Sequence, residues 1–348
     1  MKKIFFILFL APFISLLMIS AHLYYLLHEP YQGDKTHFTV KRGESFQSVK
    51  KRLYEEGFIK TPRVLDYYAR YKGLAGSLKT GSFTLHSGSN PIQILNTLVF
   101  GKADLIAITI PEGKNIYEIA QILQDQNICK AQDFLQKAKD FDFVKTLPTF
   151  IPLENWNTES SLEGYLYPET YYFMPEIDAE IVIKAMLAEF DKKIKKIVFP
   201  KSNFTKHQII TFASIVEKET GARFEKKKIA GVFHNRLQKK MMLQSDPTTI
   251  YGLRDKFLGN IKKGHLQLKT PYNTYTLQGL PIGPICNPSI ETIDAVLFPE
   301  KHDLLFFVSK NDGTHLFSAD YQTHLENIKK FQKNPKNREG KSWRNLKQ

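Results

Sequence analysis

Two glutamates close an apolar segment near the middle of the chain, in the sequence Glu217-Lys218-Glu219-Thr220. The preceding residues, 209–216, are largely apolar all round, which predicts a helix inside a core. A carboxyl group at the end of a buried helix loses solvation, and this raises its pKa toward the value that a general acid needs near neutral pH. Two positions correspond to about 200° around a helix, so the two glutamates cannot share one site. Periodicity leaves open which of them faces a cleft, and both could be ordinary surface residues.

The segment from 241 to 298 is rich in Pro, Gly, Asn, Thr and Tyr, and is therefore expected to be loop-heavy. Loops carried on a helical scaffold are where substrate-binding residues usually lie. Four motifs stand out. One includes the two glutamates and two lie in the segment 241–298, whereas the fourth precedes them: ASIVEKET at 213–220, LQSDPTTIYG at 243–252, TPYNTYTLQGLPIGPI at 270–285 and EGYLYPETY at 163–171. Together they resemble the endolytic murein (peptidoglycan) lytic transglycosylase family, and the resemblance covers nearly the whole chain.

The resemblance implies a lyase that cleaves the β-1,4 bond between N-acetylmuramic acid and N-acetylglucosamine within glycan strands. The family's acid/base is the second glutamate of its EKE motif, which is Glu219 here. One carboxylate suits this reaction, because the 6-hydroxyl of N-acetylmuramic acid attacks its own anomeric carbon and leaves a 1,6-anhydro end. Glu219 would protonate the leaving oxygen and then accept the proton of that hydroxyl. The resemblance also implies cooperation with peptidoglycan synthases and a role in ending nascent strands.

The transition state gains positive, oxocarbenium-like charge, so polar acceptors and aromatic faces beside Glu219 should help. The alternative is that such residues form turns that shape the cleft. The candidates for holding the acetamido and hydroxyl groups of the sugars are Gln244, Asp246, Tyr251, Tyr272, Asn273 and Tyr275, with Glu163 as a further candidate.

Two other functions stay open at this point. The first is a muramidase-type hydrolase, in which Asp246 activates a water molecule opposite Glu219, because glycosidases that use water generally need two carboxylates. The second is a non-catalytic protein that only binds the cell wall. The identity of the product separates the first from a transglycosylase, since hydrolysis leaves a reducing end.

An internal echo appears among the elements that precede the glutamates. Residues 40–53, VKRGESFQSVKKRL, match residues 110–123, IPEGKNIYEIAQIL, at five positions, so a strand, a glycine turn and an amphipathic helix occur twice. The first occurrence resembles a LysM module, a family that binds N-acetylglucosamine-containing glycans. A structural unit that binds nothing is the alternative. Further expected elements are helices that open at Thr61-Pro62 and Asn90-Pro91, strands at 81–85 and 105–110, a helix over 181–197, and two helices over 202–240 that are broken near Thr220-Gly221.

The N-terminus predicts a membrane anchor. The apolar run from Ile4 to Leu27 contains no charge and is long enough to cross a hydrocarbon layer, which needs about 20 residues. A cleaved signal peptide has a shorter apolar region of about 7–15 residues, and Ser20-Ala21-His22 is a poor cleavage site. Lys2 and Lys3 precede the run, so we expect a single-pass protein of the cytoplasmic (inner) membrane whose catalytic domain lies outside the cytoplasm.

The net charge is +14, and an exported chain with this charge meets anionic lipids and wall polymers, so nucleic acid is not expected as a partner. Cys129 and Cys286 are expected to be two separate buried thiols. The histidines show no metal-binding spacing and glycine-rich phosphate loops are absent, so no metal or other cofactor is expected.

The predicted fold class is α+β: an N-terminal transmembrane helix, a LysM-like α+β module and a C-terminal α+β catalytic domain. The expected boundaries are a cytoplasmic tail at 1–3, the transmembrane helix at 4–27, the LysM-like module at 36–140, a connection at 141–160, the catalytic domain at 161–335 and a basic tail at 336–348. The connection is placed by its prolines and its lack of periodic apolar positions.

Overall fold

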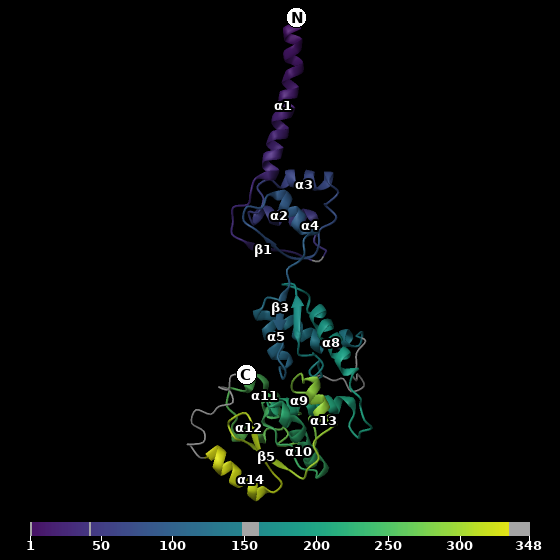
Figure 1. Cartoon of the computed structure of the whole chain (residues 1–348), viewed down its shortest axis with the longest axis vertical. Coiled ribbons are helices and arrows are strands. Elements are labelled where there is room, and N and C mark those ends of the chain that lie inside the picture. Colours follow the sequence, from purple (N-terminus) through teal and green to yellow (C-terminus); the bar gives the residue numbers. More distant parts are fainter. Residues whose placement is uncertain (1, 42, 148–159, 334–348) are drawn as a thin grey trace. The chain divides into compact units, whose positions relative to one another are not determined.

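Contacts within the chain divide it into two units (Figure 1). The structure is a computed structural model, and it describes residues 2–41, 43–147 and 160–333. Unit 1 comprises the chain up to Ala107 and the short segment Tyr172–Glu176. Unit 2 comprises Ile108–Tyr171 and the chain from Ile177 onward. The mixture of helices and short strands confirms the predicted α+β class.

The first element of unit 1 is the long helix α1 (Lys2–His28), drawn in purple in Figure 1. Its described side chains begin at Pro12, and those of Phe13, Leu16 and Leu17 are more than half exposed. Among the residues that the structure describes, we find no helix with the length and apolarity needed to cross a membrane.

The rest of unit 1 is a small α+β fold around one apolar core. Phe46, Val49 and Leu53 recur at helical spacing and are buried, and the Ser45 hydroxyl caps the start of their helix by accepting from the Ser48 N–H. Phe38 pairs with Phe83 across two antiparallel strands. The elements are β1 (Thr36–Val40), α2 (Phe46–Glu55), α3 (Pro62–Tyr71), β2 (Gly81–Leu85) and α4 (Pro91–Phe100), as the sequence predicted.

Unit 2 begins with a second set of the same elements and continues into a mainly helical part. In chain order its elements are β3 (Ile106–Thr109), α5 (Ile116–Asp125), α6 (Ala131–Lys139), α7 (Phe141–Val144), β4 (Thr170–Phe173), α8 (Ala179–Ile194), α9 (Lys206–Glu219), α10 (Lys226–Gln238), α11 (Asp246–Leu253), α12 (Lys263–Gln267), α13 (Ile290–Leu297), β5 (Phe306–Ser309), β6 (His315–Ser318) and α14 (Tyr321–Ile328). β3 pairs with β4 and β5 with β6, and the boundary between the units falls within both β3 and β4.

The predicted echo is confirmed and extends further than the sequence match. The order β1-α2-α3-β2-α4, here called the first copy, recurs as β3-α5-α6-β4-α8, the second copy, with α7 inserted. Gly43 and Gly113 both have φ +74° in the turn before the helix, a backbone conformation that favours glycine. Both helices end alike: the Phe58 N–H donates to the Leu53 carbonyl at 2.8 Å, as the Ile128 N–H does to the Leu123 carbonyl at 2.8 Å.

The catalytic candidates lie on the helical part of unit 2. Residues 209–216 of α9 are all buried, as expected for a core helix, and α9 packs against α10, α11 and α13. The helical stretch is interrupted between α9 and α10, near Thr220-Gly221, as the sequence predicted. The expectation of a loop-heavy segment over 241–298 is wrong in part, because α11, α12 and α13 lie within it. Asp246-Pro247 opens α11 because proline is well suited to the first turn of a helix.

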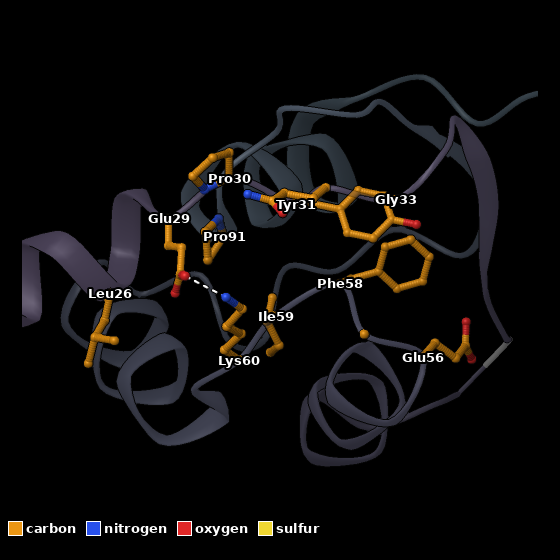
Figure 2. A pocket seen from close by; sticks show the side chains of 12 residues that line it. Leu26, Glu29, Pro30, Tyr31, Gly33, Glu56, Phe58, Ile59, Lys60 and Pro91 are labelled. Atoms are coloured by element: carbon orange, nitrogen blue, oxygen red, sulfur yellow. Dashed lines mark hydrogen bonds and ion pairs between the residues drawn. The ribbon is translucent and has the colours of Figure 1, made fainter.

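The end of α1 is tied to the rest of unit 1 through several contacts (Figure 2). Lys60 Nζ lies 2.5 Å from Glu29 Oε1, and the Tyr31 ring packs on Phe58 with ring centroids 4.9 Å apart. The Tyr31 N–H donates to the Ser89 carbonyl at 2.8 Å, and its carbonyl accepts from the Gly88 N–H at 2.7 Å. These side chains line a pocket of about 380 Å³ at the junction.

Candidate active site

Glu219 is the last residue of α9, and its side chain is only partly accessible. Ser245 donates a hydrogen bond from its hydroxyl to Glu219 Oε1 at 2.5 Å. Burial raises the pKa of Glu219 to about 7, and the nearby negative charge of Asp246 acts in the same direction. The Ser245 hydrogen bond and the positive charge of Arg236 oppose this shift. Glu219 can therefore both give and accept a proton near neutral pH.

Ser245 is held in place by a network of hydroxyl groups. The Ser245 N–H donates to Thr274 Oγ1 at 2.9 Å, and Thr248 Oγ1 donates to the Ser245 carbonyl at 2.6 Å. The two threonine hydroxyls lie 2.8 Å apart, and both threonines are fully buried. Buried groups that satisfy one another in this way fix a single geometry. The hydroxyl that faces Glu219 is thus preorganised, although sequence reasoning did not single out Ser245.

Arg236 of α10 is a second residue that sequence reasoning missed. Its Nε donates to the Leu305 carbonyl at 2.7 Å and its Nη1 to the Leu243 carbonyl at 2.7 Å. The side chain is 7% exposed, so its charge acts on Glu219 through a poorly solvated interior. Arg236 both anchors the segment before Ser245 and limits how far the pKa of Glu219 rises.

Glu217, which periodicity could not separate from Glu219, lies in a different environment. Its carboxylate forms a buried ion pair with Lys226 Nζ at 2.9 Å. It also accepts from the Ser289 N–H at 2.9 Å and from the hydroxyls of Ser289 and Thr292. Burial acts to raise its pKa, but the Lys226 charge and these hydrogen bonds hold it below the usual value. Glu217 is therefore a fixed anion with no oxygen left to exchange protons with a substrate.

Three of the predicted sugar-binding residues reach solvent near Glu219. Gln244 and Asp246 flank Ser245 and are exposed, and Tyr275 is partly exposed. The Tyr275 hydroxyl donates to Asp246 Oδ1 at 2.7 Å. Gln244 has φ +51°, a strained conformation for a residue with a side chain, and its N–H donates to the Thr274 carbonyl at 3.1 Å.

The other four predicted residues are buried. Asn273 is 0% exposed: its Oδ1 accepts from the Thr249 hydroxyl and its Nδ2 donates to the Leu268 carbonyl at 2.6 Å. The rings of Tyr251 and Tyr272 pack edge to face with centroids 4.8 Å apart. The fourth, Glu163, is 2% exposed.

Glu163 lies at the junction between the second copy and the segments that carry Tyr251 and Asn287. Its carboxyl group accepts from the Ile116 N–H at 3.0 Å, the Tyr251 hydroxyl at 2.9 Å and Asn287 Nδ2 at 2.9 Å. Burial raises the pKa of Glu163 to about 8, although the hydrogen bonds from Ile116 and Tyr251 act to lower it. With three donors around it, this group serves to position other residues.

Asn287 completes this junction, and sequence reasoning did not identify it. Its Oδ1 accepts from the N–H groups of Gly164 and Leu166 at 2.9 and 2.8 Å, and its Nδ2 also donates to the Lys114 carbonyl at 3.0 Å. Its carbonyl accepts from the Gly113 N–H at 3.1 Å. The turn of the second copy is thereby fixed against the segment that leads into α13.

The same turn also reaches α9. Lys218 Nζ donates to the Gly113 carbonyl at 3.1 Å, and a Cβ added at Gly113 would lie 3.6 Å from Glu217 Cγ. The second copy therefore contacts the end of α9, directly beside Glu219.

Comparisons with known proteins agree with one another. The model of the YceG-like family matches residues 38–330. An endolytic murein transglycosylase of Bacillus subtilis is 31% identical over 318 residues, which cover 88% of each chain. One of Streptococcus pneumoniae is 31% identical over 315 residues; they cover 83% of this chain and 57% of that protein. A crystal structure of a YceG-like protein from Listeria monocytogenes is similar with a TM-score of 0.56 and 31% identity, over 84% of this chain and 99% of that one.

Proposed function

The chain belongs to the YceG-like family, and we propose that it is an endolytic murein transglycosylase, a lyase that cuts peptidoglycan glycan strands with Glu219 as its acid/base. The observation that carries this proposal is the environment of Glu219: the residue is partly exposed, and burial of its carboxyl group raises the pKa to about 7. Glu217 is locked in its ion pair with Lys226 and does not compete for the role. The names of the relatives from Bacillus subtilis and Streptococcus pneumoniae support the same activity.

In the proposed reaction Glu219 first donates its proton to the glycosidic oxygen that leaves from N-acetylmuramic acid. The resulting carboxylate then accepts the proton of the 6-hydroxyl as this hydroxyl closes on the anomeric carbon, which gives the 1,6-anhydro end. Ser245 occupies Oε1, so Oε2 is the oxygen that faces the substrate in this scheme. The Ser245 hydrogen bond favours the carboxylate form and so helps the first transfer. Asp246 follows Ser245 in the sequence, and its negative charge would favour an oxocarbenium-like transition state.

We assign the predicted sugar-binding residues to two groups. Gln244, Asp246 and Tyr275 are accessible and would bind the acetamido and hydroxyl groups of the strand directly. The buried candidates, Tyr251, Tyr272, Asn273 and Glu163, would support the cleft from behind, because their polar atoms already bond to protein groups.

The remaining parts of the proposal come from the sequence and the family resemblance. Residues 4–27 would anchor the chain in the cytoplasmic membrane, with 1–3 inside and the remainder outside the cytoplasm. The LysM-like module, 36–140, would bind N-acetylglucosamine-containing glycan, and the catalytic domain, 161–335, would follow the connection at 141–160. Endolytic cutting, the ending of nascent strands and cooperation with peptidoglycan synthases would define its role in wall growth.

The experiment is mass spectrometry of the fragments released from purified peptidoglycan by the full chain in detergent, by Glu219→Gln and by Asp246→Asn. We expect anhydro-ended fragments from the native chain and none from Glu219→Gln. Asp246→Asn should be slower but should give the same product. Reducing ends that disappear in Asp246→Asn would replace the proposal by a hydrolase that uses both carboxylates. Equal release by the native chain and Glu219→Gln would contradict the assignment of Glu219.

A further inference from the structure

Helix α3 of unit 1 carries an exposed face of aromatic and basic side chains. Tyr67 and Tyr71 lie one turn apart and expose 74% and 84% of their surface. Arg63 and Arg70 are exposed and fall on the same face by helical spacing. The opposite face of α3 is buried: Leu65 there is 1% exposed. α3 is thus amphipathic in an unusual sense, because its outer face combines large rings with positive charge.

This combination is typical of helices that lie at a membrane surface. Tyrosine rings are enriched at the level of lipid headgroups, and arginine and lysine near an anionic surface are attracted to it. Residues 60–72 contain four basic residues and one acidic residue, Asp66. Asp66 pairs with Arg70 at 3.2 Å and with Lys50 at 3.6 Å, and Lys72 Nζ lies 5.5 Å from the centroid of the Tyr71 ring. Arg63, Arg70 and Lys72 outnumber Asp66, so this side of α3 keeps a net positive charge.

The position of α3 relative to α1 points in the same direction. α1 packs against α3 and α4, and α3 runs across the end of α1 in Figure 1. The ion pair between Glu29 and Lys60 joins the end of α1 to the residues that precede α3 (Figure 2). The hydrogen bonds of Tyr31 to residues 88 and 89 hold the same junction. The chain therefore passes from α1 into the first copy without a free linker.

We propose that the outer face of α3, defined by Arg63, Tyr67, Arg70 and Tyr71, lies on the headgroups of anionic phospholipids. The inference rests on the proposed anchoring by residues 4–27. A helix that crosses the end of a membrane-spanning helix lies parallel to the bilayer surface, and its core side then faces away from the lipid. The first copy would then be a platform docked on the membrane as well as a glycan-binding module.

The experiment uses the full chain in vesicles of phosphatidylcholine and phosphatidylglycerol, with some lipids brominated near the headgroup end of their acyl chains. Tryptophan is introduced singly by Tyr71→Trp in α3, by Leu16→Trp in α1 and by Tyr321→Trp in α14, which is 61% exposed in unit 2. The signal of the two native tryptophans is subtracted with the unsubstituted chain. We expect bromine to quench Leu16→Trp and Tyr71→Trp and to leave Tyr321→Trp unaffected.

The charge is tested in the same system. Arg63→Gln, combined with Tyr71→Trp, should lower the ratio of lipid-bound to free α3 roughly fivefold, which corresponds to about 1 kcal/mol for one basic residue at an anionic surface. Salt should have a similar effect, because screening shortens the reach of the charges. Lys239→Gln in unit 2, combined with Tyr71→Trp, is the matched control and should change nothing.

The outcomes separate this inference from the proposals on which it depends. Quenching of Leu16→Trp with Tyr71→Trp no more quenched than Tyr321→Trp would retain the anchor and overturn the surface contact. No quenching of Leu16→Trp would overturn the anchor together with the surface contact. If the quenching of Tyr71→Trp is the same with and without phosphatidylglycerol and is unchanged by Arg63→Gln, the role of anionic headgroups is overturned. None of these results alters product formation from soluble glycan fragments, which reports on Glu219 alone.

Discussion

The two copies share one design but differ in what surrounds it. In the first copy the glycine turn is open: a Cβ added at Gly43 would meet no atom within 4 Å. In the second copy the equivalent turn at Gly113 contacts Glu217 and Lys218 and is bonded to Asn287. The comparison shows how one arrangement of two strands, a glycine turn and three helices can serve either as a separate module or as the support of another helix, α9.

The residues that follow the two glycines also differ in how far along the chain their contacts reach. In the first copy Glu44, which follows Gly43, is paired with Arg52 at 3.2 Å, within the copy itself. In the second copy the same position is Lys114, whose ammonium pairs with Glu118 at 2.6 Å within the copy but whose carbonyl accepts from Asn287, far along the chain. The turn of the first copy is held by contacts within that copy, whereas the turn of the second copy is also held by hydrogen bonds to residues far along the chain. Substitutions at matched positions should therefore have local effects in the first copy and effects on catalysis in the second.

The largest difference is expected for the two ion-paired glutamates, Glu217 and Glu44. Glu217→Gln leaves the ammonium of Lys226, 3% exposed, without its close partner and should cost roughly 3–5 kcal/mol of unfolding free energy. Glu44→Gln should cost about 1 kcal/mol or less of unfolding free energy. Arg52 would still form its ion pair with Glu56 at 3.3 Å, and the Arg52 side chain is more exposed than that of Lys226. Urea unfolding of the full chain in detergent, followed by circular dichroism, measures both.

The pH dependence gives the sign of the larger effect. Because the pKa of Glu217 is lowered in the folded chain, its contribution is present above its ordinary value of 4.5 and is lost as the pH falls further. The difference in unfolding free energy between Glu217→Gln and the native chain should therefore shrink as the pH falls below 4.5. Equal losses for Glu217→Gln and Glu44→Gln at neutral pH would remove the distinction between the first copy and the end of α9 that the second copy contacts.

A smaller effect, of opposite sign, is expected at Glu219. Its folded-state pKa is raised from 4.5 to about 7, so the native chain loses stability as the pH rises through this range. Glu219→Gln removes the buried charge and should be more stable than the native chain above pH 7, by on the order of 1–3 kcal/mol. At the acid end of the range the two should be alike. Thermal unfolding across this range measures the effect, and a constant difference at every pH would refute it.

A stability effect as small as that of Glu44→Gln is expected at the two helix caps, which occupy matched positions in the two copies. Ser45 caps α2, and Asn115 caps α5 by accepting from the Tyr117 and Glu118 N–H groups. Replacing either by alanine should cost about 1 kcal/mol. Only Asn115→Ala should also lower the rate of glycan cleavage, several-fold, because the adjoining Ile116 N–H bonds to Glu163. Thermal unfolding and product release, measured in parallel, test this; an equal loss of activity in Ser45→Ala would contradict it.

The sequence predicted the local elements well and the connections between them poorly. Helical spacing at Phe46, Val49 and Leu53, and the capping positions at Asn90 and Thr61, were enough to place α2, α3 and α4. These signals lie within a few residues of one another. The boundaries expected for the modules stay predictions.

The candidate site shows where local signals end. An apolar helix that ends in two glutamates was recognisable, but Lys226 and Ser245, which distinguish them, come from other elements. Asn287 bonds to residues more than a hundred positions earlier, so no periodic pattern marks it. Cys286 is buried and Cys129 partly buried, and both are free thiols, so they confirm the expectation of separate cysteines but not that both are fully buried.

The most direct test of the central claim is the digestion of peptidoglycan by the native full chain in water enriched in heavy oxygen, with mass spectrometry of the new strand ends. If Glu219 acts alone and the 6-hydroxyl is the nucleophile, every new muramic acid end will be anhydro and will contain no heavy oxygen. Incorporation of heavy oxygen at the new ends would show that water attacks, and would contradict the single acid/base account.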